Sequence, residues 1–576
     1  MSAPTTVRRS DLPQDRAGRG PRRRAGRVPG GQGAVAAGAG RGVDAGRLSR
    51  VTGLPARLLL AVAAGLLLVL AFPGHDSWFV AAPATALLCL ALRGRGARSG
   101  ALLGAAFGLA SFIPLLGWSG IYVGPVPWLL LAVSQAAFLA VFGAVAAAAL
   151  RVPGWPVWYA ALWVAVEAAR GRVPFGGFPW ARLAFSQADA PTLATASLGG
   201  APAVTFVVAL AGGLLAAAVV ALARADRGTR ARVAVAGACL AGAVAVTAGP
   251  LLIPRPTAGQ ARAGGPTSVR VALVQGNVAR SGLTRDSPEQ VLLNHIAATN
   301  QLAADIAAGR QQRPDLVLWP ENASDIDLLA DGAAGGVVTA AARRVGAPIV
   351  VGAILDGSGD ADTVDPDVPV HRNAMIVWTP DGPVSGPAGL YVKRLPVPFG
   401  EYIPLRSLAR RVSSAVDLVP VDMTAGKRVG ALRVGPAVVG PAICFEVAFD
   451  GILRDDVRAG ADLLAVPTNN STFGFTDESV QQLAMSRLRA VEHGRSVLHA
   501  STVGVSAIIT PDGVAHGETS LFTRAVVTGQ VPLRTTETVA DRVGAWPEAI
   551  VSLVGLLAAV AGVAAARRGR RRVRAA

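Results

Sequence analysis

The hydrophobic residues of this chain are concentrated in eight stretches that approach the length of a membrane-spanning helix. These stretches lie near residues 58–73, 77–92, 99–117, 126–150, 155–169, 201–223, 233–253 and 545–566. A helix needs roughly 20 apolar residues to cross about 30 Å of hydrocarbon, and 155–169 is the shortest candidate. The pattern predicts a membrane domain of seven transmembrane helices within residues 51–253 and an eighth helix at 544–566.

The long segment between the seventh and eighth helices, residues 254–543, has a different pattern. Short β-branched runs predict strands at 269–278, 315–319, 348–355, 374–379, 429–439, 463–467 and 496–509, and helical stretches lie at 288–309 and 335–346. Alternation of this kind is typical of an α/β domain whose sheets are covered by helices. The linker 254–266, rich in Pro, Gly and Ala, marks its start.

The composition agrees with a membrane protein and argues against a nucleic-acid-binding protein. Hydrophobic residues make up 52% of the chain and charged residues only 16%, yet the formal net charge is +18. Most of this surplus lies in residues 1–50 and 567–576, which consist mainly of Arg, Gly, Ala and Pro. Such tails contain little that packs, so we expect a disordered basic tail at each end beside the membrane, and no nucleic-acid partner.

The distribution of Arg between the apolar stretches predicts the orientation of the chain. Arg clusters alternate between successive short loops, and Lys and Arg favour the cytoplasmic side of a membrane. Both termini are therefore expected in the cytoplasm, with residues 254–543 outside the cell membrane. Arg170, Arg172 and Arg182 break the alternation and need another explanation. We expect Arg170 to form an ion pair with Glu167, one helical turn earlier.

Three segments of the polar domain place a reactive side chain next to an apolar run. Glu321 ends the sequence Leu-Val-Leu-Trp-Pro-Glu, Lys393 follows Tyr-Val, and Cys444 follows Pro-Ala-Ile. Lys393 and Lys427 are the only lysines of the chain, so this cation is more informative than any Arg. Taken singly, each residue has a structural alternative: a solvated or capping Glu, a surface Lys, and a small buried Cys.

Taken together, the ordered set resembles the nitrilase, or carbon-nitrogen hydrolase, superfamily. Glu, Lys and Cys follow in this order with spacings of 72 and 51 residues and with the local motifs of that superfamily. The placement of such a domain between a seventh and an eighth helix resembles the apolipoprotein N-acyltransferase family, actinobacterial type. Further resemblance is carried by the segments 161–171, 177–180, 186–187, 274–277 and 487–492. This resemblance implies a polytopic α-helical membrane domain plus an extracytoplasmic α/β domain built as an α-β-β-α sandwich.

The resemblance also implies roles for individual residues. Glu321 would take the thiol proton of Cys444, because a free thiol with a pKa of about 8.5 needs a base to react at neutral pH. Lys393 would hold the oxyanion of each tetrahedral intermediate, helped by the backbone N–H of Phe445. Glu401 would orient or assist Lys393. For Glu446, a catalytic role and a structural role as hydrogen-bond acceptor remain equally open.

The implied reaction passes an acyl chain through a thioester. The donor would be a membrane phospholipid, and the acceptor the α-amino group of the N-terminal diacylglyceryl-cysteine of a lipoprotein. One alternative is a membrane-tethered nitrilase-type amidase that releases a small carboxylic acid. Another is a non-catalytic scaffold that binds lipoproteins or a glycosyltransferase, for which a polyprenol-phosphate mannose synthase is a conceivable partner.

Other features carry weaker predictions. The loop Gly177–Trp180 is either an interfacial anchor or part of the lipid entrance. The His residues show no metal-ligand spacing, so no metal or cofactor is expected. The segment Thr468–Gly474 and the loop after Asn277 depart from the family pattern, and with them the details of acyl-chain recognition.

Overall fold

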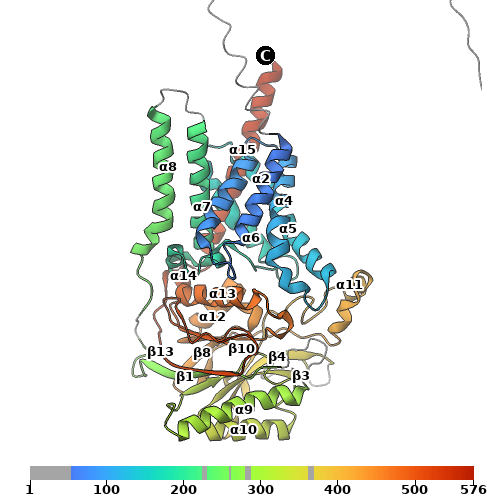
Figure 1. Ribbon diagram of the computed structural model, residues 1–576, viewed down its shortest axis with the longest axis vertical. Helices are drawn as coiled ribbons and strands as arrows, with labels where there is room; N and C mark the ends of the chain where they lie inside the picture. Colours follow the sequence, from blue (N-terminus) through green and yellow to red (C-terminus); the bar gives the residue numbers. More distant parts are fainter. Residues whose placement is uncertain (1–52, 224–229, 258–260, 279–286, 361–368, 576) are drawn as a thin grey trace, which may run out of the picture. The chain divides into compact units, whose positions relative to one another are not determined.

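The computed structural model describes residues 53–223, 230–257, 261–278, 287–360 and 369–575, with side chains up to residue 568 (Figure 1). The basic tail predicted at residues 1–50 lies outside the described residues. Helices occupy all eight apolar stretches: α2 (Leu54–Val69), α3 (Ala81–Leu92), α4 (Ala97–Leu115), α5 (Pro125–Ala149), α6 (Trp155–Arg170), α7 (Ala196–Ala223), α8 (Arg230–Ala248) and α15 (Trp546–Ala575).

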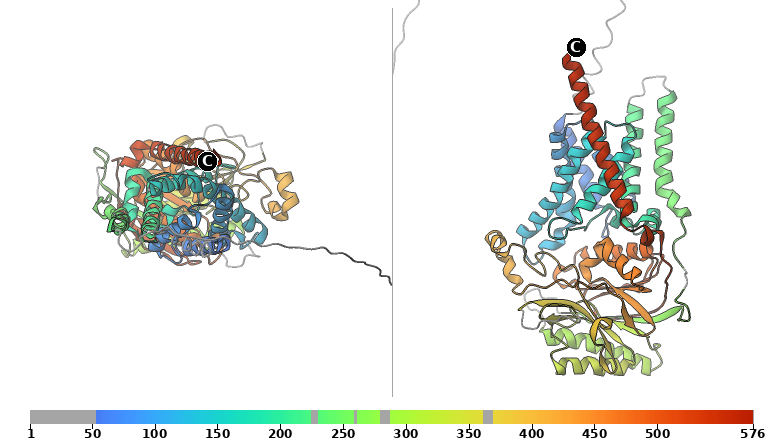
Figure 2. Two further views of the ribbon diagram at one scale, coloured as in Figure 1. Left: turned by 90° about the horizontal axis from the view of Figure 1, so that it is seen from above. Right: turned by 180° about the vertical axis from the view of Figure 1, so that it is seen from behind.

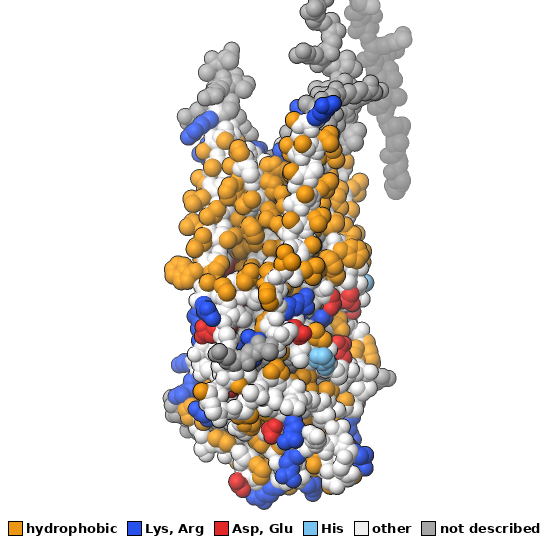
Figure 3. Space-filling model, turned by 90° about the vertical axis from the view of Figure 1, so that its left-hand side faces the viewer, with side chains coloured by type: hydrophobic (Ala, Val, Ile, Leu, Met, Phe, Trp, Pro, Cys, Tyr) orange, Lys and Arg blue, Asp and Glu red, His pale blue; other side chains and the backbone are white. Residues whose placement is uncertain are grey.

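These helices form an apolar bundle. The segments 97–115, 125–149, 191–223, 230–252 and 546–568 are long and apolar enough to cross a membrane, whereas α2 and α3 are shorter. Hydrophobic side chains cover the sides of the bundle in Figure 3, whereas charged side chains lie at its far end and over the other part of the molecule. An exposed apolar surface of this extent fits a lipid environment. The chain is therefore a multi-pass membrane protein.

Small residues allow α4 and α5 to pack closely. A Cβ on Gly104 would lie 2.0 Å from the carbonyl oxygen of Leu139, and a Cβ on Gly143 would lie 2.2 Å from that of Gly100. No side chain fits at such distances, so the two backbones touch directly. Close contact between small residues replaces the hydrophobic effect as the source of helix association in lipid.

Residues 268–532 supply two sheets that stack face to face. The first sheet has the order β13-β1-β2-β3-β4-β5, with β6 also paired to β4, and the second has the order β12-β11-β10-β9-β8-β7. The first comprises β1 (Ser268–Gln275), β2 (Leu316–Leu318), β3 (Ile349–Asp356), β4 (His371–Thr379), β5 (Gly382–Pro383), β6 (Leu390–Val392) and β13 (Ala525–Pro532). The second comprises β7 (Leu432–Val434), β8 (Ala437–Pro441), β9 (Leu463–Thr468), β10 (Val497–Ser501), β11 (Ala507–Ile509) and β12 (Ala515–His516).

Helices cover the outer face of each sheet and complete an α-β-β-α sandwich, as predicted. Helices α9 (Pro288–Ala307) and α10 (Gly332–Val345) share a core with the first sheet. A separate core, formed by side chains of both sheets, lies between them. Helices α12 (Asp450–Arg458) and α13 (Glu478–His493) cover the second sheet and lie between it and the membrane helices, together with the short α14 (Val539–Val543) (Figures 1 and 2).

Several boundaries differ from the sequence prediction. The strand expected at 429–439 is two antiparallel strands, β7 and β8, because the chain turns at Gly435 with a positive φ of 57°. The strand expected at 496–509 is likewise divided into β10 and β11. Helix α15 continues to Ala575 through the Arg cluster, where a tail was expected. The edge strand β13 and helix α13 were not predicted.

Candidate active site

Glu321, Lys393 and Cys444 converge from the ends of three different strands. Glu321 follows β2, Lys393 follows β6, and Cys444 follows β8. The Lys393 Nζ atom lies 3.0 Å from Glu321 Oε1 and 2.9 Å from Glu401 Oε2. The Lys393 side chain is only 1% exposed. The ends of strands are the usual place for a site in an α/β domain, and the sequence-predicted residues meet there.

Two neighbouring carboxylates keep the Lys393 side chain protonated. Burial alone would lower the pKa of Lys393, but Glu321 and Glu401, and the Cys444 thiolate when formed, raise it well above its ordinary value. Lys393 is therefore a permanent cation at neutral pH. A compact ammonium fixed in this way can donate to a developing oxyanion without reorganising.

Asn373, on β4, bridges the Glu321 and Glu401 carboxylates. The sequence did not identify this residue. Its Nδ2 atom donates to Glu321 Oε1 and to Glu401 Oε1, at 2.7 Å in both cases. The second oxygen of Glu321 accepts the backbone N–H of Asn469 at 2.9 Å. With each oxygen occupied, the Glu321 carboxylate has one orientation. No sequence signal distinguishes Asn373 from any other polar residue at a strand start.

Cys444 stands at a sharp turn. It is the first residue of the 3₁₀ turn Cys444–Ala448, and its φ of +53° lies in the left-handed region, which is uncommon outside Gly, Asn and Asp. Its sulfur lies 3.2 Å from the hydroxyl of Thr468. Burial and the Glu321 charge raise the pKa of the Cys444 thiol, against the opposing effect of Lys393. The thiol is thus largely neutral at rest, and a base beside it is required.

Glu446 supports the turn and also the segment that carries Lys393. One carboxylate oxygen accepts the backbone N–H groups of Arg394 at 2.7 Å and Leu395 at 3.0 Å. The other accepts the N–H of Ile443 at 2.8 Å, and the hydroxyl of Tyr391 lies within 3.1 Å of both. These donors occupy both oxygens of the Glu446 carboxylate. Of the catalytic and structural roles that the sequence left open for Glu446, the geometry therefore favours the structural one.

Replacing Glu446 by glutamine should destabilise the domain by about 1–3 kcal/mol, because an NH₂ group would face backbone N–H donors. The Cys444 turn and the Lys393 segment would lose their common anchor, so activity should fall as well. Unfolding of the detergent-solubilised protein, followed by its melting temperature, measures the loss. The exposed Glu518→Gln serves as the control. Unchanged stability and activity in Glu446→Gln would contradict this role.

The side chain of Phe445 joins the sandwich to the membrane domain. Its ring stacks on Phe178, with ring centroids 5.6 Å apart, and on Trp180 at 6.3 Å. Trp180 is 2% exposed and donates to Gln481 of α13. The Gly177–Trp180 loop therefore packs against the residue that follows Cys444, which argues against an interfacial anchor.

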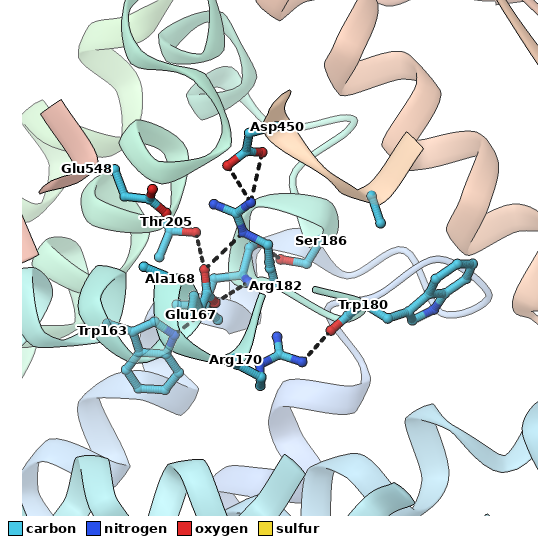
Figure 4. Close-up of polar contacts among 12 residues, drawn as sticks. Trp163, Glu167, Ala168, Arg170, Trp180, Arg182, Ser186, Thr205, Asp450 and Glu548 are labelled. Atoms are coloured by element: carbon cyan, nitrogen blue, oxygen red, sulfur yellow. Dashed lines mark hydrogen bonds and ion pairs between the residues drawn. The ribbon is translucent and has the colours of Figure 1, made fainter. Parts of the chain in front are cut away.

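Ion pairs account for two of the three arginines that break the positive-inside pattern. Arg182 Nη1 lies 2.8 Å from Asp450 of α12, and Arg182 Nε lies 3.5 Å from Glu167 of α6 (Figure 4). Arg172 pairs with Glu548 of α15. Glu167 thus pairs with Arg182 and not, as predicted, with its neighbour along the helix.

The Arg170 guanidinium is bound by uncharged oxygen acceptors. It donates to the carbonyl oxygens of Trp180 at 2.6 Å and Phe178 at 3.1 Å, and to Gln135 at 3.2 Å. Arg170 therefore fastens α5 and α6 to the 177–180 loop, and Arg182 links α6 to α12.

The sandwich and its convergent Glu, Lys and Cys define a carbon-nitrogen hydrolase domain joined to a multi-pass bundle. A family model for the carbon-nitrogen hydrolase matches residues 270–541, and one for the apolipoprotein N-acyltransferase N-terminal domain matches residues 64–214. An apolipoprotein N-acyltransferase of Mycolicibacterium smegmatis is 40% identical over 512 residues, covering 87% of this chain and 84% of the relative. The chain belongs to the apolipoprotein N-acyltransferase family of the nitrilase superfamily.

Two further comparisons cover different shares of the chain. The apolipoprotein N-acyltransferase of Pseudomonas paraeruginosa is 30% identical over 526 residues, covering 88% of this chain and 95% of the relative. An amidase from Nesterenkonia sp. is 20% identical, covering 48% of this chain and 94% of the amidase, with a TM-score of 0.33. The predicted family is confirmed, and the protein is an acyltransferase of lipoprotein biosynthesis.

Proposed function

We propose that this enzyme moves an acyl chain from a membrane phospholipid to the α-amino group of a diacylglyceryl-cysteine at the N-terminus of an apolipoprotein, through a thioester on Cys444. The observation that carries the proposal is the buried Lys393 ammonium, held between Glu321 and Glu401 beside the Cys444 turn. The acyltransferase relatives supply the acceptor class.

In the first half-reaction, the thiol proton passes from Cys444 to Glu321. The sulfur then forms a bond with the carbonyl carbon of the donor ester, and the negative oxygen of the tetrahedral intermediate lies against Lys393. When the intermediate collapses, the C–O bond breaks and the lysophospholipid alkoxide takes the proton from Glu321. The products are the acyl-enzyme and a lysophospholipid.

In the second half-reaction, the lipoprotein amine attacks the thioester carbonyl. Glu321 accepts the amine proton, a C–N bond forms, and the C–S bond breaks to release the Cys444 thiolate. The thiolate recovers a proton from Glu321, and the enzyme returns to its starting state. A thioester suits this exchange because it can outlast release of the first product and still react with an amine.

The proposed placement follows from the substrates, both of which are anchored in lipid. We assign residues 254–543 to the extracytoplasmic side, both termini to the cytoplasm, and all eight helices to membrane crossings, in accordance with the Arg alternation. The stacking of Phe178 on Phe445 brings the 177–180 loop against the residue that follows the nucleophile. A polyprenol-phosphate mannose synthase partner has no support and is not part of the proposal.

Incubation of the purified protein with acyl-labelled phospholipid and a diacylated lipopeptide tests the function. We expect label to appear first on the protein and then on the amine of the lipopeptide. A lipopeptide with an acetylated N-terminus is the matched control and should remain unlabelled. If label appears only as free fatty acid, the amidase alternative is favoured and the transferase proposal fails.

A further inference from the structure

Four buried polar side chains form a hydrogen-bonded cluster beside Cys444, in addition to the predicted triad. They are Thr468, Asn470, Glu478 and Gln482, and none is more than 2% exposed. Thr468 ends β9, and Gln482 lies on α13, a helix absent from the sequence prediction. Asn470 belongs to the segment that departs from the family pattern. The mechanism above uses none of the four.

Two of these side chains contact the sulfur directly. The Thr468 hydroxyl lies 3.2 Å from Cys444 Sγ, and Gln482 Nε2 lies 3.5 Å from the same atom. A hydroxyl and an amide N–H can both donate to a sulfur anion. Hydrogen bonds to a charged acceptor are stronger than those to a neutral one, so both contacts favour the thiolate over the thiol.

The Thr468 hydroxyl has a choice of acceptor. Its single proton can be donated to Cys444 Sγ or to Gln482 Oε1, which lies 2.8 Å away. Beside a neutral thiol, a weak acceptor, the amide oxygen is the better partner. Beside a thiolate, the charged sulfur is the better partner. The hydroxyl can therefore respond to the charge on sulfur by rotation alone, without movement of the backbone.

Asn470 lowers the free energy needed for the Thr468 hydroxyl to change its acceptor. Its Nδ2 atom donates to Gln482 Oε1 at 3.0 Å, so that oxygen keeps a partner when the Thr468 proton turns away. A buried acceptor left without a donor would oppose the exchange. Asn470 Nδ2 also donates to Glu478 Oε2 at 2.7 Å, and Asn470 Oδ1 accepts from Ser501. These contacts fix which way both amides point.

The cluster is also closely packed. A Cβ on Gly504 would lie 2.3 Å from Asn470 Oδ1 and 2.4 Å from the Ser479 hydroxyl. The backbone at Gly504 therefore lies directly against Asn470, which orients Gln482. Residues that hold a donor in place in this way preorganise it before the charge appears.

We propose that Thr468 is a further catalytic residue, whose hydroxyl donates a hydrogen bond to the Cys444 thiolate, with Gln482 as a second donor and Asn470 and Glu478 as positioning residues. The contribution recurs twice per turnover, when the thiol is deprotonated and when the thiolate leaves the thioester. This inference rests on the proposed function, since it assumes that Cys444 is the nucleophile.

Thr468→Val removes the hydroxyl and keeps the shape of the side chain. We expect the rate of acyl-enzyme formation to fall roughly 10- to 100-fold, as expected for one hydrogen bond to a charged group. The pH profile of Cys444 alkylation by iodoacetamide, read on the Cys444 peptide by mass spectrometry, should shift to higher pH. Thr468→Ser keeps a hydroxyl and should restore both properties. The ionisable groups acting on the sulfur, Glu321, Lys393 and Glu478, are unchanged in these variants.

Thr528→Val, in which the lost hydroxyl contacts only Gln311 among the described residues, is the matched control and should behave as the unmodified enzyme. If Thr468→Val does not fold, Gln482→Met removes the second donor and should shift the alkylation profile in the same direction. A folded Thr468→Val or Gln482→Met with an unshifted profile would overturn the inference. The proposed function would still stand if Cys444→Ala abolished transfer in the same assay.

Discussion

Replacing Cys444 by alanine will abolish both the acyl-enzyme and the transfer of label to the lipopeptide. Alanine has no atom that can hold the acyl chain, and the remaining groups can only polarise a carbonyl. Loss of the nucleophile in a covalent mechanism typically costs at least about 1,000-fold in rate. The measurement is intact-protein mass spectrometry after incubation with phospholipid, followed by product analysis with the lipopeptide.

The variant should fold normally, because Cys444 contributes only its sulfur to the packing around Thr468. Cys239→Ala, on helix α8, provides the matched control and should retain the acyl adduct and full transfer. Transfer that survives in Cys444→Ala would favour the scaffold alternative. An acyl adduct on another residue would identify that residue as the nucleophile and contradict the mechanism proposed for Cys444.

The helices were predicted from hydropathy, whereas the triad was predicted from the resemblance of its ordered residues and local motifs to the nitrilase superfamily. A membrane-spanning helix requires a long apolar stretch, so the helices of the bundle could be located from hydropathy. Glu321, Lys393 and Cys444 follow strands, and strands of one domain deliver their ends to a common region. The scarcity of Lys made Lys393 conspicuous in a chain that otherwise uses Arg.

The remainder of the site depends on tertiary contacts that leave no local signal. Asn373 bridges two carboxylates that lie 52 and 28 residues away along the chain. The partner of Glu167 is Arg182 because the loop after α6 folds back, whereas helical spacing favoured Arg170. The polar ring of Thr468, Asn470 and Gln482 exists only because β9 and α13 meet beside the sulfur.

Lys393 has two roles, one in charge balance and one proposed in catalysis. The ammonium balances the Glu321 and Glu401 carboxylates in the resting enzyme and is also the proposed oxyanion donor. Removing one partner of a buried ion pair typically costs about 3–5 kcal/mol of stability, because the other charge is left uncompensated. A loss of activity in a single variant therefore does not identify the catalytic role, and a second variant is required.

Lys393→Met should lower both the stability and the rate of acyl-enzyme formation, the rate by at least roughly 100-fold, as for loss of an oxyanion donor. Adding Glu401→Gln removes one of the two carboxylates that face each other. The double variant should regain much of the lost stability but none of the activity, since no donor for the oxyanion is restored. Melting temperature and the rate of acyl-adduct formation give the two readouts. Lys427→Met, an exposed lysine on the same domain, should change neither. Recovery of activity in the double variant would show that Lys393 acts only by balancing charge, because the oxyanion would then be stabilised by other donors.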